Sequence, residues 1–187
     1  MDELQLYFEP VDTSLFPEKF LPGQIGAGVS FNTGDDFPDP ENIQIAIFGV
    51  PENRNSRSNR DASFAADAIR PYFYALQNHF TNIAVADLGN LKTGMSVDDT
   101  YEAVSEVISI LLKNNVVPLM LGGSQDLTYA NYLSYEKRGR IINILSVDSR
   151  FDIGKSDEPF HNESWLNKII FRDPNFLFNY SNLGYQT

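Results

Sequence analysis

Asn42-Ile-Gln-Ile-Ala-Ile-Phe-Gly49 is the stretch from which the fold of this chain can be read. It is a short apolar run, rich in β-branched isoleucine, and a glycine closes it. A run of this length and composition favours a buried strand over a helix. The stretch therefore predicts one of the inner strands of a sheet.

Strands and helices are predicted to alternate after this strand. Further strands are expected at 81–88, 116–121 and 140–147, and helices at 62–80, from 99 onward and at 127–136. Pro71 should kink the first helix or begin a second one. Asp99-Thr-Tyr-Glu102 resembles a capping box at the start of the next helix. Alternation of this kind predicts right-handed crossovers and a parallel sheet with helices on both faces.

Residues 1–42 read differently, as turns and extended pieces around prolines. Phe16, Phe20, Phe31 and Phe37 favour an arm that packs on the domain, and a partner surface is the alternative. We therefore predict an N-terminal arm at 1–42 and an α/β domain at 43–187. The last residues, 182–187, resemble the entrance to another strand, so we expect a domain that is truncated at its C-terminus.

The composition excludes several classes of function. The chain has 14 Lys and Arg against 25 Asp and Glu, a net charge of −11, which repels nucleic acid and anionic membranes. It has no cysteine, which excludes thiolate ligands and nucleophiles, and its two histidines are His79 and His161. No apolar run is long enough to span a bilayer and the start of the chain is acidic, so we expect a cytoplasmic location.

Ligands of parallel sheets bind beyond the carboxyl ends of the strands, and three predicted strand ends are polar. The first two are Asp87-Leu-Gly-Asn90 and Gly122-Gly-Ser-Gln-Asp126. The Gly122-Gly123 turn has two interpretations, a backbone cradle for an anion or simple turn geometry.

The third strand end, Asp148-Ser-Arg-Phe-Asp152, is the most informative. In extended backbone, Asp148, Arg150 and Asp152 would point the same way. Two converging carboxylates repel each other unless a cation lies between them. That cation would be a metal ion or the guanidinium of Arg150, and a solvated loop is the alternative.

Taken in order, several segments resemble the ureohydrolase family of arginases, agmatinases and formiminoglutamases, with formiminoglutamases the nearest. The resemblance runs from about residue 43 to 165. It is carried by Ile45-Ala-Ile-Phe-Gly-Val-Pro51, Ala68-Ile-Arg70, Asp87-Leu-Gly-Asn90, Pro118-Leu-Met-Leu-Gly-Gly-Ser-Gln125 and Val147-Asp-Ser-Arg-Phe-Asp152. It implies a three-layer αβα fold built on an arginase-like parallel sheet.

The resemblance also implies a pair of Mn²⁺ ions that generate the attacking hydroxide. At the family's ligand positions this chain has Gln125, Asp148, Arg150 and Asp152. Gln125 offers only a weak carbonyl ligand, and Arg150 stays protonated and cannot be one. A further Asp-x-Asp motif is expected beyond residue 187. We therefore expect no cofactor, or Mn²⁺ if the site functions, with Arg150 in place of the metal between Asp148 and Asp152.

Other candidates carry two interpretations each. His161 falls where the family places a histidine near the substrate, and an exposed loop histidine is the alternative. Gln125, Asp126 and Arg150 would line the pocket, although Asp126 would also serve as a cap for the helix at 127. His79 is expected to cap the end of the preceding helix.

Two larger groups of side chains also have alternatives. Arg54, Arg57 and Arg60 form a basic loop that is solvated or binds an anion or a partner. The aromatic group is expected in the core or at an interface rather than stacked on a ligand; it comprises Trp165, Phe171, Phe176, Phe178 and Tyr180.

Three functional hypotheses follow. The favoured one is a catalytically degenerate ureohydrolase relative that acts by binding or assembly. Its possible partners are a small amidine or amino-acid-like ligand and further copies of the same chain. The second is an active metal-dependent hydrolase of linear amidines, whose missing ligands come from elsewhere. The third is an unrelated, doubly wound ligand-binding domain.

Overall fold

A computed structural model describes residues 2–79, 82–155 and 157–186. The strands are β1 (Phe8–Glu9), β2 (Val29–Phe31), β3 (Ile45–Gly49), β4 (Val85–Leu91), β5 (Val117–Leu121), β6 (Ile142–Val147) and β7 (Leu177–Leu183). The α-helices are α1 (Asp2–Gln5), α2 (Ala65–Ala75), α3 (Val97–Lys113), α4 (Leu127–Lys137) and α5 (Trp165–Ile170). Short 3-10 helices lie at Thr13–Leu15, Ile25–Gly28, Pro40–Asn42 and Arg60–Phe64.

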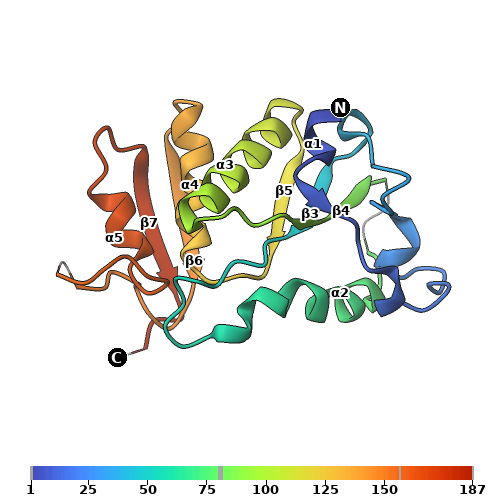
Figure 1. Ribbon diagram of the computed structural model, residues 1–187, viewed down its shortest axis with the longest axis horizontal. Helices are drawn as coiled ribbons and strands as arrows, with labels where there is room; N and C mark the ends of the chain where they lie inside the picture. Colours follow the sequence, from blue (N-terminus) through green and yellow to red (C-terminus); the bar gives the residue numbers. More distant parts are fainter. Residues whose placement is uncertain (1, 80–81, 156, 187) are drawn as a thin grey trace.

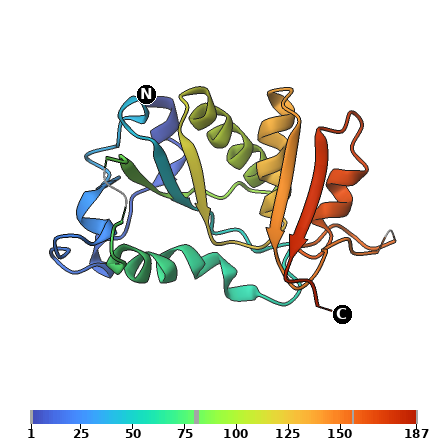
Figure 2. The same cartoon turned by 180° about the vertical axis from the view of Figure 1, so that it is seen from behind.

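The strands form two sheets rather than one. The larger sheet has the order β1-β4-β3-β5, with β2 also paired to β4, and β6 pairs with β7 in the smaller sheet. All of these pairings are parallel except that of β1 with β4. Figures 1 and 2 show β5 and β6 as the strands on either side of the break, with arrows that point the same way. The predicted α/β class with parallel strands is confirmed, and the division into two sheets is new.

The main core lies between the strands and a row of helices formed by α3, α4 and α5 (Figure 1). Even-numbered β3 residues, such as Ala46 and Phe48, pack into this core with Val104 and Ile108 of α3. Odd-numbered β3 residues face α2, where Ile45 and Ile47 line an apolar cavity of about 570 Å³. This alternation gives one strand two buried faces, as the sequence predicts.

Two helix boundaries differ from the prediction. Pro71 lies inside a single helix, α2, and a 3-10 turn precedes that helix. The capping box of α3 is one turn earlier than expected: Ser96 Oγ accepts from Asp99 N at 3.1 Å and the Asp99 carboxylate accepts from Ser96 N at 2.8 Å. Ser96 caps because its backbone is extended, whereas Asp99 is already helical.

Residues 2–42 contribute both β1 and β2 to the larger sheet. The rings of Phe16, Phe20 and Phe31 surround Tyr74 of α2, with centroid distances of 5.5, 6.2 and 5.2 Å. These contacts hold the N-terminal residues against α2. Within the described residues, no helix has the length and apolar character needed to cross a bilayer.

The predicted roles of three further side-chain groups have mixed outcomes. Trp165 is fully buried and Tyr180 packs beside it, but Phe171 and Phe178 are 79% and 80% exposed. His79 is exposed and does not cap α2, because that helix ends at Ala75, earlier than predicted. Of the last segment, Asn182 and Leu183 end strand β7 and residues 184–186 follow it without regular structure, while Thr187 lies outside the described residues.

Candidate functional site

The ends of β5 and β6 meet through a side-chain contact. Gln125, after β5, donates from its amide Nε2 to Asp148 Oδ2 at 2.9 Å. The other carboxylate oxygen of Asp148 accepts from the backbone N of Arg150, also at 2.9 Å. Both oxygens of Asp148 therefore already have donors from this chain.

The predicted bridge of Arg150 between two aspartates is wrong. The Arg150 guanidinium pairs with Glu163 at 3.0 Å, and its side chain is 68% exposed. Asp152 has a positive φ of 53°, so the backbone after β6 is not extended and the three side chains do not align. Positive φ is uncommon for a residue other than glycine, although Asp adopts it more readily than most.

Asp152 is instead turned into the protein. Its carboxylate Oδ2 accepts from the indole Nε1 of Trp165 at 2.9 Å, and the residue is only 8% exposed. Burial raises the pKa of the Asp152 carboxyl, the Trp165 bond opposes that rise, and the nearby charge of Asp148 adds to it. Asp148 and Asp152 thus have separate environments.

Three of the predicted site residues come together in one pocket of about 380 Å³. Arg150, Asp152 and His161 line it, together with Arg57 of the loop after β3 and Glu163. Lys155, Glu158, Ile153 and Gly154 complete its wall. Positive and negative side chains therefore face the same small volume.

His161 is buried, at 5% exposure, so its interpretation as an exposed loop residue is wrong. Its Nδ1 accepts from the backbone N of Glu163 at 3.1 Å, which leaves the proton on Nε2, 3.3 Å from a Glu158 carboxylate oxygen. The ring is buried because the loop closes on itself, with Ser164 Oγ accepting from His161 N at 2.9 Å. Both ring nitrogens of His161 therefore already have partners from this chain.

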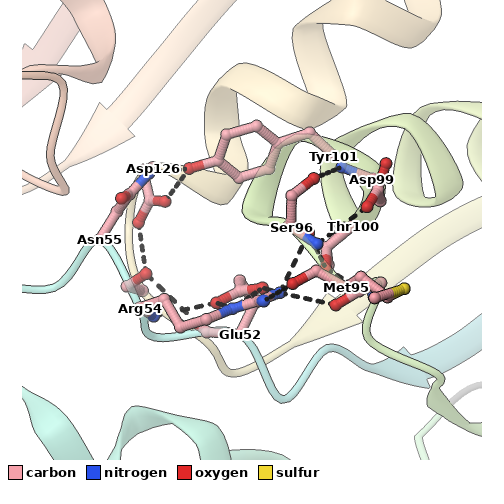
Figure 3. A network of polar contacts seen from close by, with 11 residues as sticks. Glu52, Arg54, Asn55, Met95, Ser96, Asp99, Thr100, Tyr101 and Asp126 are labelled. Atoms are coloured by element: carbon pink, nitrogen blue, oxygen red, sulfur yellow. Dashed lines mark hydrogen bonds and ion pairs between the residues drawn. The ribbon is translucent and has the colours of Figure 1, made fainter.

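Asp126 lies apart from this pocket, in the polar network of Figure 3. Its carboxylate accepts from the Tyr101 hydroxyl and from Ser124 Oγ, and Tyr101 also accepts from Asn55 Nδ2 at 2.8 Å. Burial and the bond to Asp126 raise the pKa of Tyr101, so it remains a donor. Asp126 does not cap α4, because its own backbone is helical and directs the carboxylate elsewhere.

Arg54 anchors the other side of the same network (Figure 3). Its guanidinium pairs with buried Glu52 and donates to the carbonyl oxygens of Met95 at 2.8 Å and Ser96 at 3.1 Å. Arg54 keeps a 40% exposed side chain, as expected of a loop residue, but its guanidinium is bonded to the chain itself. The sequence prediction missed Glu52. A signal was available, because this acid directly follows a buried strand and lies two residues before an arginine. The network fixes the loop after β3 to the start of α3.

The Gly122-Gly123 turn is explained by geometry rather than by an anion. The backbone N of Gly123 donates to Ala62 O at 3.0 Å and that of Ser124 to Glu52 O at 2.8 Å. Gly123 has a φ of 79°, and an added Cβ would lie 2.6 Å from Val50 O. Of the two interpretations of this turn, simple turn geometry agrees with the structure, because the N–H groups of Gly123 and Ser124 already have protein acceptors.

The polar end of β4 is closed as well. Asp87 is fully buried and accepts from Arg70 Nε at 2.7 Å and from the Tyr74 hydroxyl. Arg70 also donates to Asn90 at 2.7 Å. Among the described residues, the side chains of Asp87 and Asn90 thus already have protein partners at this end of the sheet.

The side chains present do not fit a binuclear Mn²⁺ site. Within residues 2–79, 82–155 and 157–186, no three His, Asp or Glu side chains gather as a metal would require. Gln125 carries an amide whose nitrogen donates to Asp148, Arg150 is a permanent cation, and Asp152 accepts from Trp165.

Comparisons with known proteins agree with the resemblance. The model of the Arginase family matches residues 43–173. The chain is 27% identical over 146 residues to the mitochondrial guanidino acid hydrolase of Rattus norvegicus. That alignment covers 72% of this chain and 39% of the hydrolase. It is 24% identical over 191 residues to the formimidoylglutamase of Streptococcus pyogenes serotype M3. That alignment covers 96% of this chain and 57% of the formimidoylglutamase.

A solved structure has the same fold. Trypanosoma cruzi formiminoglutamase with Mn²⁺ superposes with a TM-score of 0.65 at 17% identity, over 75% of this chain and 53% of that one. The chain spans between 33% and 57% of the length of the curated relatives that it matches. Because the family model matches well over half of its residues, this chain belongs to the arginase family, the ureohydrolases.

Proposed function

We propose that this chain is a catalytically degenerate ureohydrolase-family domain that binds a small amino-acid-like zwitterion and has no binuclear metal site of its own. The observation that carries the proposal is the pocket in which Arg57 and Arg150 face the same volume as Asp152 and Glu163. The arginines suit a carboxylate, and the acids suit an amidine or ammonium group.

The ion pairs now in the pocket are weak enough for a ligand to replace. Arg57 pairs with Glu158 at 2.9 Å and Arg150 with Glu163 at 3.0 Å, and both arginine side chains are largely exposed. Exposed pairs of this kind are screened by solvent and contribute little to stability. A zwitterion that makes both contacts at once would therefore exchange two weak pairs for two bonds inside a pocket.

The names of the relatives support this class of ligand. Guanidino acids and formimidoylglutamate each join an amidine-type cation to a carboxylate, which is the charge pattern that the pocket presents. Binding of such a molecule needs no metal. Hydrolysis in this family needs one, and the amide of Gln125 and the guanidinium of Arg150 at the family's ligand positions support its absence here.

Calorimetric titration tests the binding half of the proposal. Formiminoglutamate should bind saturably, and agmatine, which lacks the carboxylate, should bind at least about tenfold more weakly. Arg57→Ala should weaken formiminoglutamate binding by a similar factor, because it removes a carboxylate partner. Arg60→Ala, in the same basic loop but outside the pocket, is the matched control and should bind normally. Equal binding of formiminoglutamate by both variants would contradict the proposal that this pocket is the binding site.

Metal analysis and an activity assay test the catalytic half. Protein purified in Mn²⁺ should hold much less than one ion per chain. It should release neither urea nor formamide above background from arginine, agmatine or formiminoglutamate. Stoichiometric Mn²⁺ together with turnover would establish the alternative, an active metal-dependent amidine hydrolase.

A further inference from the structure

The carboxylate of Glu158, on the wall of the pocket, has three side-chain donors around it. Arg57 Nη1 lies 2.9 Å from its Oε2, His161 Nε2 lies 3.3 Å from the same oxygen, and Lys155 Nζ lies 3.7 Å from Oε1. Two of these donors are cations, and both oxygens of the carboxylate are engaged. The position of the Glu158 carboxylate therefore marks where the same donors would hold the carboxylate of a ligand.

Two of the three donors are fixed by contacts that do not involve Glu158. Arg57 N donates to Asn162 Oδ1 at 3.0 Å, so the loop after β3 is bonded directly to the segment between β6 and α5. The ring of His161 is buried, and its Nδ1 accepts from Glu163 N at 3.1 Å. Donors that are already positioned bind an anion without the loss of conformational entropy that a mobile group would suffer.

A second pocket, of about 240 Å³, adjoins the first at Glu158. Glu158 and Lys155 line both pockets, whereas Phe160, Asn167 and Lys168 line the second one and not the first. The side chain of Glu158 therefore borders two open volumes. A change of its side-chain torsions would carry the carboxylate from one pocket toward the other.

Lys168, in the second pocket, is a half-buried cation that is held by aromatic rings rather than by an acid. Its Nζ lies 4.1 Å from the centroid of the Phe160 ring and 4.4 Å from that of Tyr129. Among the residues that the structure describes, no carboxylate lies within ion-pair distance of this ammonium. Burial lowers the pKa of Lys168, as expected where no adjacent acid compensates for lost water. A carboxylate that enters this pocket would therefore gain a cationic partner.

We infer that Arg57, Lys155 and His161 form a carboxylate subsite that Glu158 occupies in the unliganded protein. The carboxylate of a bound amino-acid-like molecule takes its place, and Glu158 turns into the second pocket and pairs with Lys168. The inference rests on the proposed function for the class of ligand, and it adds an internal competitor to that site. The apparent affinity for the ligand then depends on how strongly the subsite holds Glu158.

Calorimetric titration with formiminoglutamate is the first test. Glu158→Gln removes the competing charge, so it should bind formiminoglutamate at least about tenfold more tightly than the native chain. Asp157→Asn is the matched control, because Asp157 is exposed, directly precedes Glu158 and lines neither pocket. Its affinity should stay within about twofold of the native value, since solvent and salt screen an exposed charge. If the native chain binds and Glu158→Gln binds no more tightly, the inference is overturned.

A double-mutant cycle tests the second position of Glu158. Lys168→Met keeps a long apolar side chain over the two rings and removes the charge, so it should weaken formiminoglutamate binding at least about threefold. In the Glu158→Gln background the same substitution should have no effect, because no displaced carboxylate needs a partner. Lys168→Arg keeps a cation and should bind as the native chain does. No loss with Lys168→Met alone, or an equal loss in both backgrounds, would overturn the pairing of Glu158 with Lys168.

Acetate separates a failure of this inference from a failure of the proposed function, because it has a carboxylate and no amidine or ammonium group. Added acetate should shift the ring resonances of His161 in Glu158→Gln at concentrations at least about tenfold lower than in the native chain. Shifts in neither protein, or equal shifts in both, would overturn the subsite even if formiminoglutamate binds. If acetate behaves as expected and formiminoglutamate binds neither protein, the subsite stands and the proposed function fails. The Lys168→Met cycle is then measured with acetate.

Discussion

Arginine side chains of similar appearance in the sequence have very different environments in this protein. Arg70 is fully buried and bonded to Asp87, Asn90 and the Gly89 carbonyl, while Arg150 lies mostly in solvent. Burial of a guanidinium is tolerated only when acceptors surround it, and those acceptors come from β4, across the fold from α2. Neighbouring residues in the chain could not reveal that difference.

At the residue scale, Glu52 should make the stability of the protein depend on pH. Burial raises the pKa of Glu52, but hydrogen bonds from Arg54 outweigh that effect and hold it below its usual 4.5. Its stabilising effect is therefore complete above the unfolded-state pKa and is lost as pH falls through the folded-state value. Glu52→Gln should lower the unfolding free energy at pH 7 by about 2 kcal/mol, less than for a fully buried pair because Arg54 is partly exposed.

Urea denaturation at several pH values measures this effect. The difference between the native chain and Glu52→Gln should shrink as the pH falls below about 4.5, the ordinary Glu value. Glu102→Gln, which breaks the exposed pair with Lys137, is the control and should cost less than about 1 kcal/mol at every pH. A penalty for Glu52→Gln that does not change with pH would contradict the ion-pair explanation.

At the element scale, the start of α3 depends on its capping box and on Arg54. Ser96 and Asp99 satisfy each other's backbone N–H groups, and the Ser96 carbonyl accepts from Arg54. Strand and helix types were predicted correctly for β3, β4, β5, β6, α3 and α4, because periodicity depends on which faces are buried. The cap was misplaced by one turn, because two overlapping patterns were present and only the backbone of Ser96 is extended.

Ser96→Ala tests the cap. The substitution removes the acceptor for Asp99 N and should lower the unfolding free energy by about 1 kcal/mol, as measured by a shift of the denaturation midpoint. Ser58→Ala, in an exposed loop, should change it by less than about 0.5 kcal/mol. Equal effects of the two substitutions would mean that α3 begins without help from Ser96.

At the scale of the whole molecule, the family's metal-ligand positions come from elements in two different sheets. Gln125 follows β5 and Asp148 follows β6, and their contact bridges the break between the sheets. Positions 125 and 148 are thus in contact, although position 125 carries an amide and position 150 a guanidinium in place of metal ligands. The fold decides whether these positions lie close together, and the residue type at each position decides whether a metal ion could bind there.

Gln125→His combined with Arg150→His should raise Mn²⁺ affinity by about tenfold, because imidazole is a ligand for Mn²⁺ whereas a guanidinium is not. Titration with Mn²⁺ under electron paramagnetic resonance measures the bound fraction. Gln77→His combined with Arg60→His adds the same groups at exposed positions outside the cleft and should have no effect. Unchanged affinity in the first variant would contradict the assignment of 125 and 150 to ligand positions.

The sequence by itself determined the α/β class, the main strands and the family, because hydrophobic periodicity and ordered short motifs are local properties of the chain. It also suggested Arg150, Asp152 and His161 as candidates, and these three residues line one pocket. Only the tertiary structure decided that Arg150 pairs with Glu163, that Asp152 accepts from Trp165, and that Asp126 belongs to a buried network. The partners in these contacts lie 13 to 25 residues away in the chain, and which partner a charge finds depends on how the loops fold over the strand ends.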